Sequence, residues 1–229
     1  MDPGLPIPDD QRVPIGTRAL VLTVSDGVAS GSRLDESGSV LAARLGQLGC
    51  TVEHSVVPDD REGIRVALLS ALDEHVLIVT TGGTGLTPRD VTPQATAAIL
   101  DFEVPGLAEA MRAAGRAKTP MADLSRGLVG VARGRLIVNV PGSPRAALES
   151  LAALEPTLRH ALETLAGPFD HGAAADRPDL PTPDPAVPDL PARVIESHDP
   201  SATARSAEPT PGNAADPWRD LPPARYDPS

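Results

Sequence analysis

The sequence predicts an α/β fold, in which a mainly parallel β-sheet is flanked by helices to give a single three-layer domain. Two observations carry this prediction. Short apolar runs rich in β-branched residues occur at Arg18–Val24 and Val76–Val79, apolar and polar residues alternate at Thr51–Val57, and turn-forming residues follow each of the three segments. Between these runs lie longer segments with the apolar spacing of amphipathic helices. Strands that alternate with helices are typical of βαβ units, and these build parallel sheets.

Two segments in the first half of the chain have clear helical periodicity. The first lies between Asp35, which suits an N-cap, and Gly49, which suits a helix end. The second follows Asp60, which suits an N-cap as well. The apolar faces are formed by Val40, Leu41, Leu45 and Leu48 in the first helix and by Ile64, Ala67, Leu68, Ala71 and Leu72 in the second. We expect each helix to pack this face on the sheet.

The second half of the chain is expected to complete the sheet and its helical layers. Thr92 is expected to cap a helix over Pro93–Leu100, because proline is favoured at the first helical position. Pro156 is expected to break the last helical segment in two. The remaining predicted elements are a short helix over Leu107–Arg112, strands at Leu128–Val131 and Leu136–Val140, and closing helices at Arg145–Ala153 and Thr157–Leu165.

Composition divides the chain into three parts. Residues 1–16 contain four prolines and are expected to form a flexible N-terminal arm. Residues 17–167 are expected to form the folded domain. Residues 168–229 hold fourteen of the 26 prolines and eleven acidic against five basic residues, with almost no aliphatic clusters. We therefore expect an acidic, Pro/Ala-rich and disordered C-terminal tail.

Charge and composition exclude several functions. The formal net charge of −11 and the absence of a Lys/Arg stripe predict no nucleic-acid partner. No apolar run approaches the roughly 18 residues of a membrane span, and no signal peptide is recognisable. Cys50 is the only cysteine, so no intrachain disulfide can form, and its expected role is that of a small core residue. These features predict a soluble, cytoplasmic protein without membrane contact.

A glycine-rich loop follows the third predicted strand. Gly82, Gly83, Thr84 and Gly85 stand between that strand and a predicted helix, at a point where parallel sheets bind ligands. Glycine lets backbone N–H groups turn toward a phosphate. The loop lacks the third glycine of a dinucleotide fingerprint and the Gly-Lys-Ser/Thr of a P-loop, so a purely structural turn is the alternative. Asp90, five residues beyond Gly85, favours the phosphate interpretation together with Mg²⁺, because a metal ion would relieve its repulsion of the phosphate.

Further polar residues follow the other strands at the same expected edge. Asp26 and Asp59 come directly after the first two strands, and Ser143 follows the last one. A single aspartate in such a position is most often a turn former or a helix cap. Three aspartates at corresponding positions of successive β-α units indicate a shared site. Ser143 is expected either to cap the next helix or to donate to a ligand phosphate.

These motifs together resemble the MogA/MoaB family of molybdenum cofactor biosynthesis, and the resemblance extends from about Arg18 to Gly167. It rests on the motifs Ser25-Asp26, Pro58-Asp59-Asp60, Thr81 to Pro93 (TGGTGLTPRDVTP), Val104-Pro105-Gly106-Leu107 with Met111-Arg112, Leu124-Ser125-Arg126, and Asn139 to Pro144 (NVPGSP). The resemblance implies a molybdopterin adenylyltransferase, which converts ATP and molybdopterin into adenylyl-molybdopterin and pyrophosphate. It also implies Mg²⁺, a homotrimer and the downstream molybdate-inserting enzyme as a partner.

The resemblance also assigns roles to individual residues. It implies that Asp59 and Asp90 are catalytic and hold Mg²⁺. It further implies that the nucleotide and the pterin are bound by Ser25, Asp26, Gly82, Gly83, Thr84, Gly85, Gly142 and Ser143. Attack of one phosphate on another needs positioning and charge neutralisation rather than a protein nucleophile, which agrees with the residue types present.

Two alternatives stay open. The chain could be a MoaB-like protein of the same pathway that binds pterin or nucleotide with little or no catalytic activity. The domain also resembles the catalytic domain of the molybdate-inserting enzyme, but that enzyme carries large additional domains, which the 62 residues after Gly167 cannot replace. The adenylyltransferase is favoured because both Asp59 and Asp90 are present.

Overall fold

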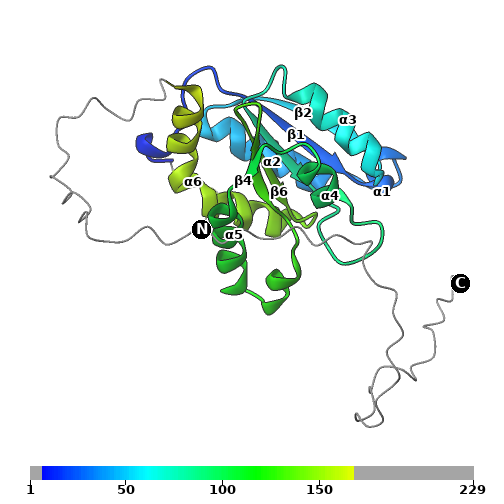
Figure 1. The fold of residues 1–229 in the computed structure, drawn as a ribbon. Helices are drawn as coiled ribbons and strands as arrows, with labels where there is room; N and C mark the ends of the chain where they lie inside the picture. Colours follow the sequence, from blue (N-terminus) through cyan, green and yellow to red (C-terminus); the bar gives the residue numbers. More distant parts are fainter. Residues whose placement is uncertain (1–6, 168–229) are drawn as a thin grey trace, which may run out of the picture. The chain divides into compact units, whose positions relative to one another are not determined.

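The computed structural model describes residues 7–167, which contain one mixed six-stranded sheet (Figure 1). The strand order is β2-β1-β3-β6-β5-β4. Strands β2, β1, β3 and β6 are parallel to one another. Strand β5 runs antiparallel to β6, and β4 runs antiparallel to β5. The strands are β1 (Arg18–Val24), β2 (Thr51–Val57), β3 (Leu77–Thr81), β4 (Phe102–Glu103), β5 (Val129–Ala132) and β6 (Arg135–Val140). The expected mainly parallel sheet is confirmed, and the short β4 was not predicted.

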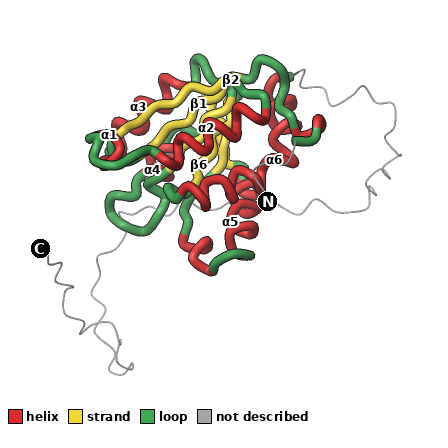
Figure 2. The backbone as a smooth tube through the Cα atoms, turned by 180° about the vertical axis from the view of Figure 1, so that it is seen from behind, coloured by secondary structure: helices red, strands yellow, loops and turns green. Residues whose placement is uncertain are grey.

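Helices cover both faces of the sheet, as Figure 2 shows from behind. One hydrophobic cluster contains buried residues of α2, α5 and α6, and the other contains those of α3 and α4. The helices are α1 (Asp26–Ala29), α2 (Glu36–Leu48), α3 (Arg61–Ala71), α4 (Thr92–Ala97), α5 (Pro105–Arg116) and α6 (Pro144–Ala166). This arrangement is the three-layer architecture that the sequence predicts.

The central strands send alternate side chains into the two helical layers. In β1, Ala19 and Val21 belong to the cluster under α2 and α6, whereas Leu20 and Leu22 belong to the one under α3. This alternation follows from the two-residue repeat of a strand, and it explains why a strand buried on both faces is apolar throughout. Cys50 packs against the first cluster, and burial raises the pKa of its thiol to about 11.

The predicted helix ends are confirmed at four positions. Asp35 accepts a hydrogen bond from the Gly38 amide at 2.8 Å, and Asp60 accepts one from Gly63 at 2.7 Å. Ser143 caps α6 by accepting from Ala146. Gly49 ends α2 with φ of +103°, a left-handed conformation that favours glycine.

The predicted break at Pro156 is wrong, because α6 runs without interruption from Pro144 to Ala166. Proline deprives the helix of one N–H donor, but tertiary packing outweighs this loss. Glu155, only 1% exposed, accepts two hydrogen bonds from Arg44 of α2, at 2.7 and 2.6 Å. The helix is further fixed on both sides of the proline by the buried residues Leu151, Leu154, Leu158 and Leu162.

Part of the predicted N-terminal arm, residues 7–16, lies within the described residues. Residues 1–6 lie outside the described part, but Ile7 and Val13 are buried in the cluster under α2 and α6. The Val13 amide donates to the Leu48 carbonyl at 3.0 Å. Two apolar side chains of this segment thus contribute to the core. The predicted tail, residues 168–229, lies outside the described residues.

The helices of residues 7–167 do not include one that is both long enough and apolar enough to cross a membrane. α6 has 23 residues, but its exposed face carries ion pairs between Arg145 and Glu149 and between Arg159 and Glu163. Its apolar stripe is occupied by packing against the sheet and against α2 and α5.

We expect Glu155→Gln to lower the free energy of unfolding by about 3 kcal/mol, because it leaves the Arg44 guanidinium beside a buried neutral group. Urea denaturation followed by circular dichroism would measure the change. Glu62→Gln is the matched control, since Glu62 pairs with Arg65 on the solvent-exposed face of α3 and its loss should not be measurable. Equal effects of the two substitutions would show that the α2–α6 ion pair does not hold the helix across Pro156.

Candidate functional site

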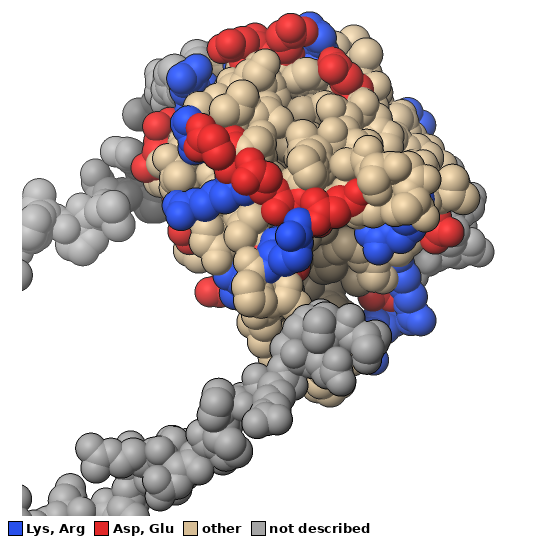
Figure 3. Space-filling view, turned by 90° about the vertical axis from the view of Figure 1, so that its right-hand side faces the viewer, with Lys and Arg blue, Asp and Glu red and all other residues tan. Residues whose placement is uncertain are grey.

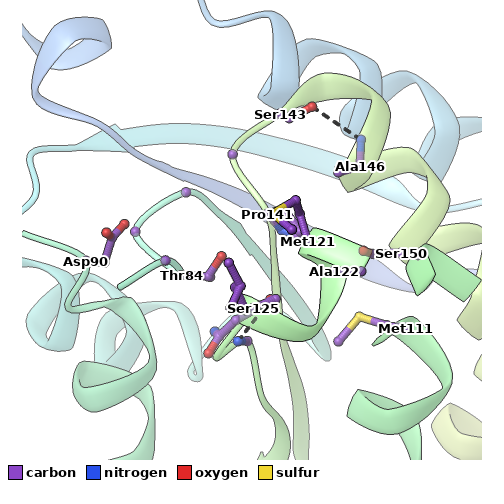
Figure 4. A pocket seen from close by; sticks show the side chains of 18 of the residues that line it. Thr84, Asp90, Met111, Met121, Ala122, Ser125, Pro141, Ser143, Ala146 and Ser150 are labelled. Atoms are coloured by element: carbon purple, nitrogen blue, oxygen red, sulfur yellow. Dashed lines mark hydrogen bonds between the residues drawn. The ribbon is translucent and has the colours of Figure 1, made fainter. Parts of the chain in front are cut away.

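A pocket of about 670 Å³ lies at the edge of the sheet where the parallel strands end (Figure 4). Turns after β1, β2, β3 and β6 form one side of it, and α5 with the 3₁₀ helix η2 (Pro120–Leu124) forms another. All predicted site residues except Asp26 line this pocket, namely Ser25, Asp59, Gly82, Gly83, Thr84, Gly85, Asp90, Gly142 and Ser143. Residues that are far apart in the sequence thus meet where the topology predicts a ligand site.

The glycine loop after β3 has a conformation that side chains would not allow. Gly82 and Gly83 have φ values of +100° and +61°. A Cβ on Gly82 would lie 2.3 Å from the Val24 carbonyl oxygen, and one on Gly83 would lie 2.3 Å from Oγ1 of Thr92. A Cβ on Gly142 would lie 3.2 Å from Cα of Gly82. The turns after β3 and β6 therefore approach each other backbone to backbone.

Each of the four carbonyls of the glycine loop accepts a hydrogen bond from Thr92 or Arg126. The Gly82 and Gly83 carbonyls accept hydrogen bonds from Oγ1 and the amide of Thr92, at 2.9 and 3.1 Å. The Thr84 and Gly85 carbonyls accept from the amide and Nε of Arg126, at 3.0 and 2.6 Å. Within residues 7–167, the N–H groups of Gly83 and Thr84 have no hydrogen-bond acceptor. Backbone amides in this state are the donors of an anion-binding concavity.

The predicted N-cap role of Thr92 is wrong. Thr92 is the first residue of α4, its preceding residue Val91 is the cap, and no side-chain cap bond forms there. The Thr92 hydroxyl is used for the Gly82 carbonyl instead. Fastening the loop thus takes precedence over capping the helix, and α4 becomes a direct support of the glycine loop.

A buried polar cluster lies under the same loop. Nδ2 of Asn139, on β6, donates to Oγ1 of Thr80 on β3 at 2.9 Å and to Oγ1 of Thr96 on α4 at 3.0 Å. All three residues are fully buried. The cluster ties α4 to the two central strands through polar contacts, which fix orientation more strictly than apolar packing. One signal for this cluster is visible in the sequence, an asparagine within the otherwise apolar run Leu136–Val140.

Asp26 and Asp59 connect the turns after β1 and β2. The Asp26 amide donates to Oδ2 of Asp59 at 2.9 Å, and the Asp59 amide donates to Oδ1 of Asp26 at 3.0 Å. The second oxygen of Asp26 forms an ion pair with Arg89, in the turn that follows the glycine loop. The Asp26 carboxylate thereby holds three turns together, and Asp26 itself is not among the described residues that line the pocket, so its predicted binding role stays a prediction.

Asp90 is held in a tight turn beside the loop. Its Oδ2 accepts hydrogen bonds from the amide and the hydroxyl of Thr87, at 2.8 and 2.6 Å. Partial burial by itself raises the pKa of Asp90, but the bonds from Thr87 and the charge of Arg126 outweigh burial and hold that pKa below its ordinary value of 3.8. Asp90 is therefore a carboxylate at neutral pH.

The two pocket aspartates fit the ligand chemistry of Mg²⁺. Residues 7–167 contain no group of three or more acidic, histidine or cysteine side chains arranged for a metal. Mg²⁺ does not require such a group, because it is commonly held by one or two carboxylates together with substrate phosphates and water. Within residues 7–167, Oδ2 of Asp59 accepts a hydrogen bond from the Asp26 amide, and Asp90 accepts hydrogen bonds from Thr87 and from the Gly85 amide. Asp59 thus has a second oxygen for such an ion.

The side of the pocket formed by α5 and η2 includes apolar side chains. Met111 of α5 and Met121 with Ala122 of η2 lie there, away from Asp90 and Thr84 (Figure 4). Met121 is 61% exposed, so the apolar surface reaches the mouth of the pocket. A wall of this kind suits a flat, weakly polar ring, whereas the glycine loop suits phosphate.

Two arginines of the pocket were not identified as site residues from the sequence. Arg112, whose spacing from Glu109 suggests a surface ion pair, instead donates to the Gly127 carbonyl at 3.0 Å. Arg33 donates to Oγ of Ser25 at 2.8 Å. Neither arginine stands beside a glycine or at a strand end, and although Met111-Arg112 is one of the motifs of the resemblance, no site role was assigned to Arg112.

Comparison with known proteins places this architecture in a family. Residues 20–160, more than half of the chain, match the family described as a probable molybdopterin binding domain. The molybdenum cofactor biosynthesis bifunctional protein of Synechococcus elongatus is 42% identical over 159 residues, which cover 69% of this chain and 50% of that protein. The molybdopterin adenylyltransferase of Helicobacter pylori is 34% identical over 154 residues, covering 65% of this chain and 88% of that enzyme.

Solved structures of Mog and MoaB proteins resemble this chain as well. The Mog protein of Mycobacterium ulcerans is 43% identical with a TM-score of 0.63, covering 66% of this chain and 99% of its own. MoaB of Thermus thermophilus is 48% identical with a TM-score of 0.60, covering 67% and 99%. The chain belongs to the MogA/MoaB family of molybdenum cofactor biosynthesis. It spans about half the length of the bifunctional proteins that it matches.

We expect Gly82→Ala to destabilise the protein by at least about 2 kcal/mol, because a Cβ at φ of +100° adds backbone strain and overlaps the Val24 carbonyl. Gly46→Ala on α2 is the control, since a Cβ there meets nothing within 4 Å and should stabilise the helix by about 0.5–1 kcal/mol. Thermal unfolding of both variants would test this. Equal stability of the two variants would show that the loop after β3 relaxes without cost.

A second prediction concerns pH. The folded pKa of Asp90 lies below its ordinary value of 3.8, so ionised Asp90 stabilises the folded state above about pH 4, and this contribution is lost as the pH falls through the folded pKa. The difference in unfolding free energy between the wild type and Asp90→Asn should be constant near neutral pH and shrink below about pH 4. Urea unfolding over a pH series would measure it. A difference that grows on acidification would contradict the assignment.

Proposed function

We propose that this protein is a molybdopterin adenylyltransferase, which transfers AMP from ATP to the terminal phosphate of molybdopterin with Mg²⁺. The observation that carries the proposal is that one pocket is lined both by the loop residues Gly83 and Thr84, whose amides have no acceptor within residues 7–167, and by the carboxylates of Asp59 and Asp90. Relatives that this chain covers nearly in full, from Helicobacter pylori and Pyrococcus furiosus, carry the name molybdopterin adenylyltransferase. That name supports the proposal.

The proposed reaction exchanges one phosphate bond for another. An oxygen of the molybdopterin phosphate forms a bond to the α-phosphorus of ATP, and the bond from that phosphorus to the oxygen bridging to the β-phosphate breaks. Pyrophosphate leaves with this bonding electron pair. No protein nucleophile is needed, so the protein contributes positioning and charge compensation.

The residues of the pocket divide this task. The amides of Gly83 and Thr84 donate to phosphate oxygens of the nucleotide, and they need no reorganisation because their carbonyls are already fastened. Asp59 and Asp90 would hold Mg²⁺, which supplies charge neutralisation between the two anionic substrates. The apolar wall at Met111 and Met121 accepts a flat ring and excludes water from it.

The resemblance adds two parts to the proposal, namely that the chain works as a homotrimer and that its product passes to the molybdate-inserting enzyme. The second candidate function is binding of pterin or nucleotide with little or no catalysis. Asp59 favours this alternative in one respect, because its contact with the Asp26 amide is by itself a sufficient structural reason for a carboxylate.

Substitution of the two aspartates separates these functions. We expect Asp59→Asn and Asp90→Asn each to lower the rate of adenylyl transfer by at least about 100-fold, because each removes a metal-holding charge. The assay is formation of adenylyl-molybdopterin from ATP, Mg²⁺ and molybdopterin. Asp60→Asn is the control: this neighbour of Asp59 caps α3, does not line the pocket, and should keep full activity.

The result decides between the candidates. Loss of transfer with retained circular dichroism spectra supports the assigned roles. Full activity of either pocket variant would refute the role of that residue. A wild-type protein that binds both substrates without forming product would establish the binding function instead.

A further inference from the structure

We propose that Arg33, positioned by Ser25, binds a phosphate group of a ligand in the pocket. This inference rests on the proposed function only for the identity of the ligand, a nucleotide or a phosphorylated pterin. The relevant chemistry, recognition of a phosphate by a guanidinium group, depends on the pocket alone.

A compact turn places Arg33 at the pocket. The Gly27 carbonyl accepts hydrogen bonds from the Arg33 amide at 2.9 Å and from the hydroxyls of Ser30 and Ser32, at 3.3 and 3.0 Å. These three donors fold the segment between α1 and α2 back on itself. The Arg33 side chain then reaches the pocket, where it contacts Ser25 at the end of β1. The position of this side chain is therefore built by local structure, although Arg33 is exposed to solvent.

The contact between Arg33 and Ser25 leaves two groups that can donate to a ligand, the Arg33 guanidinium and the Ser25 hydroxyl. Oγ of Ser25 accepts one hydrogen bond from the Val28 amide at 3.3 Å and one from Nη2 of Arg33 at 2.8 Å. A hydroxyl group has two acceptor positions and one hydrogen to donate. Both acceptor positions of Ser25 are therefore used, and its hydrogen is left for an acceptor that the pocket can receive. Ser25 is only 6% exposed, so a ligand oxygen is the natural acceptor.

The charge of Arg33 has no carboxylate partner in the described part of the chain. Across residues 7–167, no carboxylate lies within ion-pair distance of its guanidinium. The acidic side chains that line the pocket are Asp59, Asp90 and Glu149, and Glu149 is paired with Arg145. A phosphate that enters the pocket between Asp59 and Asp90 meets repulsion, and Arg33 is one of two lining residues of positive charge. Arginine with an open fork of N–H groups is suited to bind it.

The test is a binding measurement on the full chain, so that it does not depend on turnover. Isothermal titration would compare ATP and molybdopterin as ligands for the wild type, Arg33→Ala and Arg33→Lys. Adenosine, which lacks phosphate, is the ligand control. Arg65→Ala is the protein control, because Arg65 pairs with Glu62 on α3 and does not line the pocket.

We expect Arg33→Ala to weaken the binding of at least one phosphate ligand by about 10- to 100-fold, which is the usual value of a charged hydrogen bond, and to leave adenosine binding unchanged. Arg33→Lys should lie between the wild type and Arg33→Ala, because lysine keeps the charge but lacks the fork. A loss confined to ATP assigns Arg33 to the nucleotide phosphates, and a loss confined to molybdopterin assigns it to the pterin phosphate. Arg65→Ala should match the wild type.

Several outcomes would overturn the inference. Unchanged affinity of Arg33→Ala for both phosphate ligands would do so, as would an equal loss for adenosine, which would indicate general damage to the pocket. If Arg33 proves necessary for binding but the wild type forms no adenylyl-molybdopterin, the proposed function fails and the inference stands. If the wild type forms the product and Arg33→Ala binds both substrates normally, the inference fails and the proposed function stands. A wild type that binds neither ligand refutes both.

Discussion

The site depends on one constraint, the fastening of the glycine-loop carbonyls by Thr92 and Arg126. A loop of four residues with small side chains has many conformations, and most of them would point its carbonyl oxygens toward a phosphate and repel it. Here each of the four carbonyls is already engaged by a donor, so the amides of Gly83 and Thr84 are left on the other side. The loop is preorganised before any ligand arrives, which lowers the cost of ordering it on binding.

Helix α4 connects the glycine loop to the core of the protein. Thr92 holds the loop, and one turn further along the helix Thr96 joins the buried cluster with Asn139 and Thr80. The helix has only six residues and no side-chain cap, so its stability comes from these contacts rather than from intrinsic propensity. Arg126 reaches the loop from the segment between η2 and β5, and thereby ties the glycine loop to the side of the pocket that carries η2 and its apolar residues.

Sequence patterns predicted most of the fold, because burial on two faces and helix caps leave strong signals. The β1 run and the caps at Asp35 and Asp60 are of this kind. The errors come from competition between local and tertiary preferences: packing of α6 and the Arg44–Glu155 pair override Pro156, and the loop carbonyl takes the hydroxyl of Thr92. Such contacts join residues far apart in the chain, and no local pattern encodes them.

The same distinction applies to the site. The position of its glycines and aspartates was predictable because each follows a strand at one sheet edge, whereas the contacts of Asp26 and of Arg33 depend on side-chain directions within turns. Asp26 sits one residue from Ser25, yet its carboxylate joins Asp59 and Arg89 rather than the pocket. Adjacent residues of a tight turn point in different directions, and only the folded turn shows which of them faces the ligand.

The overall negative charge of the chain makes the local groups of these turns important for binding an anionic ligand. The chain carries a net charge of −11, and on the face shown in Figure 3 the acidic side chains form a band with basic ones beside it. A protein of this charge does not attract a phosphate by its overall field. Attraction must arise over a few ångströms, and the oriented amides of the glycine loop and the lining arginines Arg33 and Arg112 are the groups of the pocket that can supply it. The pocket at the end of the parallel strands brings these donors together, so a strongly acidic chain can still provide a site for anionic ligands.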